Sequence, residues 1–114
     1  ICWVAGFSFG AWIGMQLLMR RPEINGFISV SPPANIRDFS FLAPCPSSGL
    51  IVHGDKDNIA SFDSTKILVE KLQKQKKVEI QFNPIKGADH FYENYSSDLE
   101  SSVKDYIQQK LPKD

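Results

Sequence analysis

The sequence has no excess of charge of either sign and few cysteines. Thirteen lysines and arginines balance thirteen aspartates and glutamates in 114 residues. A balanced chain has little attraction for polyanions, so we expect neither nucleic acid nor a membrane surface as a partner. Cys2 and Cys45 are far apart and belong to no C-x-x-C or histidine-rich cluster. This spacing argues against a disulfide framework and against a metal site, and it favours a cytoplasmic protein.

The sequence shows no internal repeat, no low-complexity tract and no linker, so residues 1–114 are predicted to lie in a single domain. The chain starts at Ile1, and no basic segment of the kind that opens a signal peptide precedes its first apolar run. We therefore expect a further segment upstream of Ile1.

The longest apolar run extends from Ile1 to Met19 and has only two polar side chains, Ser8 and Gln16. It is close to the length of about 20 residues that a membrane-spanning helix needs, and its glycines recur at every fourth position as in packed membrane helices. The same run contains Gly6-Phe7-Ser8-Phe9-Gly10, a G-x-S-x-G turn that can hold a nucleophilic serine. These two interpretations are incompatible, and the rest of the chain decides between them.

Short apolar runs alternate with helical patterns along the chain. Strands are predicted over 1–6, 26–31, 49–54 and 78–84, the last of them nearer a sheet edge because its apolar residues alternate. Helices are predicted over 9–20, over 61–76 with Ile67, Leu68 and Leu72 inward, and from a capping box at Ser97 and Glu100. Residues 32–48 form a proline-rich loop with room for a short helical turn. This order predicts an α/β fold, a three-layer α/β/α sandwich around a parallel sheet of about four strands.

Three of the four predicted strands are followed by a group that could carry out catalysis: Ser8, Asp57 and His90. Ligands bind beyond the carboxyl ends of parallel strands, where these groups would meet. A serine hydroxyl is a weak nucleophile until an imidazole takes its proton, and the imidazole needs a carboxylate to fix its tautomer. The order nucleophile, acid, histidine therefore predicts a Ser8–Asp57–His90 catalytic triad.

The G-x-S-x-G turn has its own requirements. Small residues at Gly6 and Gly10 are expected to let the strand and the helix meet closely around a strained bend that exposes Ser8. Because the helix begins at that bend, the backbone N–H of Phe9 is predicted to donate to the oxyanion of the reacting carbonyl.

Neighbouring residues offer alternatives. Asp55 lies closer to its strand end and could be the acid, although we interpret it as a turn carboxylate that bonds local N–H groups. His53 lies inside the strand and precedes the acid, which favours a structural role. Asp89 is adjacent to His90, and adjacent residues seldom face each other as an acid–base pair. The glycines lack the G-x-G-x-x-G spacing of a dinucleotide site, so no cofactor is expected.

At these residues the sequence resembles the α/β-hydrolase superfamily, and more narrowly the small, lidless bacterial hydrolases related to dienelactone hydrolases. The resemblance rests on CWVAGFSFGAWIGMQLLMRRPEI, FLAPCPSSGLIVHGDKD and GADHFY. It implies Ser8 as nucleophile, Asp57 as acid, His90 as base, Phe9 N–H as oxyanion donor, and hydrolysis of an ester or related acyl bond in a small-molecule substrate.

The chain departs from this family in length. Family members are about twice as long, and their first half supplies the early strands and the loop that holds a second oxyanion N–H. Residues 1–6 are then expected to form an apolar sheet edge, which invites another strand. We expect either self-association through residues 1–6 or pairing with an upstream segment.

Two rival functions follow from the same residues. A hydrolase scaffold can act as an interaction or oligomerisation module with an idle triad, because fold alone does not establish activity. Membrane anchoring through residues 1–19 would explain that run but not the positions of Asp57 and His90. The sequence therefore favours a strand, a turn and the start of a helix over residues 4–14.

Overall fold

The computed structural model describes residues 2–111. The elements follow one another in the order β1 (Trp3–Phe7), α1 (Phe9–Arg20), β2 (Gly26–Val30), the 3-10 turn η1 (Ser40–Leu42), β3 (Gly49–Gly54), α2 (Phe62–Gln73), β4 (Ile80–Ile85) and α3 (Ser96–Lys110). The strands form one parallel sheet in the order β1-β2-β3-β4. The predicted α/β fold and the predicted order of strands and helices are confirmed.

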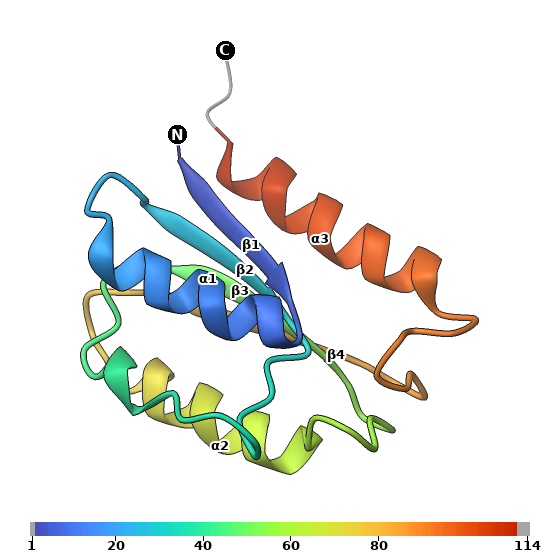
Figure 1. The fold of residues 1–114 in the computed structure, drawn as a ribbon. Coiled ribbons are helices and arrows are strands. Elements are labelled where there is room, and N and C mark those ends of the chain that lie inside the picture. Colours follow the sequence, from blue (N-terminus) through green and yellow to red (C-terminus); the bar gives the residue numbers. More distant parts are fainter. Residues whose placement is uncertain (1, 112–114) are drawn as a thin grey trace.

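Helices cover both faces of the sheet, as Figure 1 shows: α1 and α2 lie on one side and α3 on the other. Neighbouring residues of a strand point to opposite faces. Ile51 of β3 therefore packs in the cluster with Met15 and Leu72, whereas Leu50 packs in the cluster with Tyr106. These two apolar clusters join the helices to the two faces of the sheet and so complete the three-layer sandwich. The sheet is held between them, and its carboxyl ends are fixed in place.

Where the element boundaries differ from prediction, they differ by one to three residues, most clearly in β4 and α2. Strand β4 begins and ends slightly later than 78–84 and includes Pro84, which is tolerated because β4 is an edge strand. Helix α2 is shorter than predicted. It buries Thr65, Val69 and Leu72, and it leaves Ile67 on its opposite side, 56% exposed, so the prediction of an inward Ile67 was wrong.

The predicted capping box at the start of the last helix is also wrong. Helix α3 begins at Ser96, and its N-cap is Tyr95, which makes no side-chain capping bond. The chain enters the helix through a turn in which Tyr95 N–H donates to Tyr92 O at 2.8 Å. This early start places Ser97 within the first helical turn, where its hydroxyl does not cap.

The two serines at these helix starts give a matched test of capping. Ser61 is the N-cap of α2, and its Oγ accepts a hydrogen bond from Ser64 N–H at 3.1 Å. We expect Ser61→Ala to lower the free energy of unfolding by about 1 kcal/mol, because that N–H loses its acceptor. The same change at Ser97 should alter stability by less than about 0.5 kcal/mol. Urea unfolding of both variants checks this, and equal losses would contradict it.

Residues 2–20 do not form a long apolar helix. They form β1, a tight turn and α1, and no helix within residues 2–111 has the length and apolar character to span a membrane. Strand β1 lies at the edge of the sheet and pairs only with β2 among the described strands. The predicted sheet edge is therefore present as Trp3–Phe7, while Ile1, which the prediction of residues 1–6 included, lies outside the described residues.

Candidate active site

Ser8 occupies the sharp bend between β1 and α1. Its backbone has φ 56° and ψ −119°, a strained conformation for a residue with a side chain. The bend is held by the Ser8 N–H, which donates to Val30 O of β2 at 2.8 Å. Backbone hydrogen bonding to the sheet thus fixes a turn that points the Ser8 hydroxyl beyond the strand ends.

His90 bridges Ser8 and Asp57. Its Nε2 lies 2.9 Å from Ser8 Oγ, and its Nδ1 lies 2.7 Å from Asp57 Oδ2. The imidazole is buried and packs against the rings of Phe7 and Phe91, with centroids 5.2 and 5.0 Å away. These contacts leave the ring little freedom to turn away from either partner.

The carboxylate of Asp57 is enclosed and held by backbone groups of its own turn. Its Oδ1 accepts hydrogen bonds from Ile59 N–H at 2.9 Å and Ala60 N–H at 2.8 Å. An ionised carboxylate can only accept, so His90 Nδ1 carries the proton that it shares with Oδ2. His90 Nε2 is then free to accept a hydrogen bond from the Ser8 hydroxyl.

The two glycines of the bend differ in their steric surroundings. A Cβ on Gly6 would come within 2.2 Å of Gly10 O and 2.7 Å of Ala11 N, so only glycine fits there. A Cβ on Gly10 would meet no described atom within 4 Å. The close approach of strand and helix thus requires a glycine at position 6, as predicted. The prediction that residue 10 must also be small finds no steric support.

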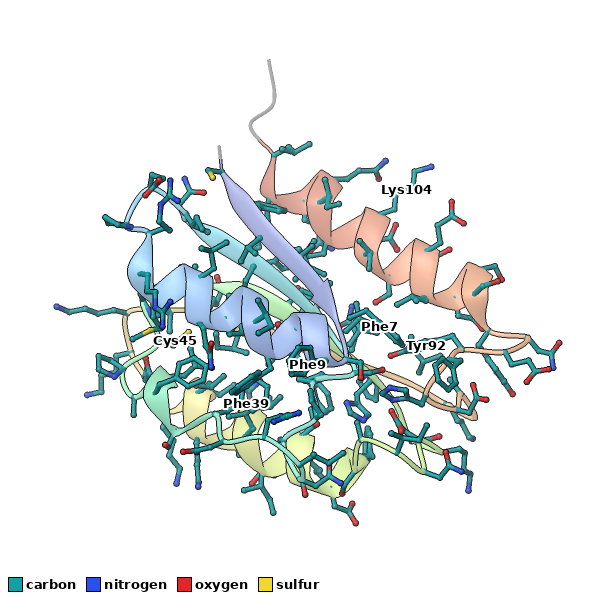
Figure 2. The ribbon with its side chains drawn as sticks, in the orientation of Figure 1. Phe7, Phe9, Phe39, Cys45, Tyr92 and Lys104 are labelled. Atoms are coloured by element: carbon teal, nitrogen blue, oxygen red, sulfur yellow. The ribbon has the colours of Figure 1, made fainter. Side chains whose placement is uncertain are left out.

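Phe9 is the first residue of α1, where backbone N–H groups have no acceptor within the helix. This position leaves its N–H available next to Ser8. The side chains of Phe7, Phe9 and Phe91 are exposed beside the bend, and Figure 2 shows Phe7, Phe9 and Tyr92 at the same end of the sheet. The surroundings of Ser8 are therefore largely aromatic.

The carboxylates considered as alternatives serve other partners. Asp55 Oδ1 accepts from Gly87 N–H at 2.7 Å, and Lys56 N–H donates to Ala88 O at 3.0 Å. Asp55 therefore joins its turn to the loop of His90, so our interpretation of purely local bonding was wrong. Asp89 Oδ1 accepts from Glu93 N–H and caps its own loop.

A buried polar pair that the sequence did not reveal supports the same loop. Tyr92 OH lies 2.9 Å from Ser31 Oγ and donates to Val52 O at 3.4 Å. Burial raises the pKa of Tyr92 to about 12, so its phenol stays neutral and can donate. The motif GADHFY contains this tyrosine, but nothing in the motif indicates a partner 61 positions earlier. The contact anchors the His90 loop to the end of β2.

The described residues contain no group of three His, Cys, Asp or Glu side chains that could hold a metal ion. A cavity of about 330 Å³ lies between residues 34–43 and α2, but none of Ser8, Asp57 and His90 lines it. The cavity is therefore separate from the Ser8–His90–Asp57 arrangement.

Comparison with known proteins places the chain in a family. An uncharacterised protein of Rickettsia prowazekii (strain Madrid E) is 50% identical over 108 residues, which cover 91% of this chain and 45% of that protein. A protein of unknown function from Agrobacterium tumefaciens, described as a candidate α/β-hydrolase, is 52% identical with a TM-score of 0.95, over 99% of this chain and 54% of that one. A lidless α/β serine hydrolase from Xanthomonas campestris is 28% identical with a TM-score of 0.85, over 98% and 49%.

This chain thus spans about half the length of these relatives. The profile of the prolyl oligopeptidase family matches residues 2–114. The α/β-hydrolase resemblance is confirmed, whereas a particular relation to dienelactone hydrolases stays a prediction. The chain belongs to the prolyl oligopeptidase family of α/β-hydrolases.

Proposed function

We propose that the protein is a serine hydrolase that cleaves an ester or a related acyl bond through an acyl-enzyme on Ser8. The observation that carries the proposal is the continuous hydrogen-bonded path from Ser8 Oγ through both nitrogens of His90 to Asp57 Oδ2. Membership of a hydrolase family supports it, as does the description of the Xanthomonas campestris relative as a serine hydrolase. The substrate is a small molecule with an acyl group.

In the first half of the proposed reaction, Ser8 Oγ attacks the acyl carbon while its proton passes to His90 Nε2. Asp57 accepts the hydrogen bond from Nδ1 and stabilises the imidazolium that forms. The carbonyl oxygen gains negative charge, and the Phe9 N–H at the start of α1 donates to it. When the intermediate collapses, His90 Nε2–H gives its proton to the leaving alcohol, and the acyl group stays on Ser8.

In the second half, His90 takes a proton from water as the water oxygen attacks the acyl carbon. The bond to Ser8 Oγ breaks, His90 returns a proton to that oxygen, and the carboxylic acid leaves. Side chains and water carry every proton in this scheme, so it requires no cofactor. We propose that a second oxyanion donor comes from outside residues 1–114, because hydrolases of this fold use two N–H groups.

A fluorophosphonate probe tests the proposal, since it reacts covalently with an activated serine. The complete protein, including the segment proposed to supply the second oxyanion donor, should be labelled at Ser8, and Ser8→Ala should abolish both labelling and turnover of a p-nitrophenyl ester. The exposed Ser101 on α3 gives the control, because Ser101→Ala should be labelled like the unchanged protein. Absence of labelling and of turnover in the unchanged protein would overturn the proposal and favour an interaction module.

A further inference from the structure

A second histidine lies behind the acid and has no part in the reaction as proposed. His53, near the end of β3, is fully buried, and its Nε2 lies 2.7 Å from Ala60 O and 3.2 Å from Asp57 Oδ2. Its other nitrogen, Nδ1, has no hydrogen-bond partner among the described residues. The ring packs against Phe62, with centroids 6.0 Å apart.

The contacts of His53 fix its tautomer. A carbonyl oxygen can only accept, so Nε2 must carry the proton that is donated to Ala60 O. Burial lowers the pKa of His53, and the nearby His90 acts in the same direction, while Ala60 O and Asp57 oppose them. The ring is therefore neutral, with a bare Nδ1 and one N–H directed into the turn over residues 57–60.

That single N–H donates to Ala60 O, and Nε2 also lies 3.2 Å from Asp57 Oδ2, a close approach without the geometry of a second hydrogen bond. Asp57 accepts three hydrogen bonds, two from backbone groups on Oδ1 and one from His90 on Oδ2. Ala60 supplies one of those backbone N–H groups, so the bond from His53 to Ala60 O holds the residue that in turn holds the carboxylate.

We propose that His53 is a positioning residue for the acid: its Nε2–H donates to Ala60 O and so fixes the turn that holds Asp57 Oδ1, while its ring lies against Oδ2 and keeps that oxygen toward His90. This inference rests on the proposed hydrolase function.

The unpartnered Nδ1 supports a role beyond core packing. A buried nitrogen without a partner destabilises the fold, and an apolar residue of similar size would fill the same space without that cost. Histidine at this position is explained by the N–H that it donates to Ala60 O beside Asp57. A purely structural interpretation accounts for the bond to Ala60 O but not for the approach to Oδ2.

The test compares His53→Leu, which removes the donor, with His53→Gln, whose amide nitrogen can occupy the place of Nε2. Active sites are first counted by fluorophosphonate titration, so that kcat for a p-nitrophenyl ester is obtained per working site. Because leaving a buried hydrogen-bonding group without its partner typically costs about one to two powers of ten, we expect His53→Leu to lower kcat per site by about 10- to 100-fold. KM should change little, and His53→Gln should regain most of the loss.

The pH profile separates positioning from folding. A loosened Asp57 stabilises the His90 imidazolium less, so the acid limb of kcat/KM should move to lower pH in His53→Leu and return in His53→Gln. A merely structural His53 would reduce the number of titrated sites and leave both kcat per site and the acid limb unchanged, which would overturn the inference while the proposed function stands.

Two further outcomes are covered by the same experiment. If His53→Leu gives no active sites that the probe can count, His53→Asn replaces it, because its shorter amide does not extend to the place of Nε2. The difference in kcat per site between His53→Asn and His53→Gln then tests the inference. If the unchanged protein neither reacts with the probe nor turns over the ester, the proposed function fails, and the inference fails with it.

Discussion

Asp57→Asn is expected to lower kcat by about 10³- to 10⁴-fold, with little change in KM. The amide oxygen can still accept from Ile59 and Ala60 N–H, so the turn should keep its shape. Its NH2 group would then face His90 Nδ1 and force that nitrogen to accept. The ring proton would move to Nε2, which could no longer take the proton of Ser8. Steady-state hydrolysis of a p-nitrophenyl ester measures the loss.

Asp55 supplies the matched control for this experiment. Asp55→Asn makes the same chemical change two residues earlier, and its amide oxygen can still accept from Gly87 N–H. Because Asp55 bonds the loop and not the imidazole, we expect this variant to keep activity within about 10-fold, the cost of weakening one hydrogen bond to a charged group. Similar losses in the two variants would contradict the assignment of Asp57 as the acid.

The second large effect is expected at Gly6. In Gly6→Ala the new methyl group would lie 2.2 Å from Gly10 O, a backbone atom that cannot move without opening the turn. We expect the free energy of unfolding to fall by about 3 kcal/mol or more, the upper range for overpacking in a close-packed region. Probe labelling should fall as well, because the turn that presents Ser8 would shift.

Gly10→Ala tests whether the effect is specific to the close contact. Its methyl group would project into open space, and alanine favours the helical conformation of α1. Thermal unfolding of the two variants should therefore differ clearly, with Gly10→Ala close to the unchanged protein. A loss at Gly10 equal to that at Gly6 would show that crowding against Gly10 O is not the cause.

The fold could be predicted from the sequence because its main signals are local. Short apolar runs such as 49–54 form buried strands, and helix α1 has the predicted bounds. Ser8, Asp57 and His90 each follow a predicted strand, and the carboxyl ends of parallel strands lie at the same edge of the sheet. This rule predicted that the three residues would meet. Their catalytic roles remain a proposal, while the structure shows that their side chains lie within hydrogen-bonding distance.

The parts that the sequence did not indicate depend on contacts between distant residues. Asp55 looked like a local turn residue, yet its partner is Gly87, 32 positions later. Ser31 and Tyr92 are ordinary in type and spacing, and only the packing of two loops makes them a buried pair. The error at Ser97 has a similar origin, because the preceding turn decides where α3 begins. No local pattern encodes such pairs.

Strand β2 has a consequence for the dimensions of the catalytic centre. It lies between the strand that leads to Ser8 and the strand that leads to Asp57. Neighbouring strands are about 4.8 Å apart, so the ends of β1 and β3 lie roughly 10 Å from each other. The side chains of Ser8 and Asp57 close part of this gap, and the His90 ring bridges the rest through its two hydrogen bonds. The spacing of the paired strands therefore sets the separation between the backbones of Ser8 and Asp57. Side-chain substitutions leave that separation unchanged, and only a change of the backbone would alter it.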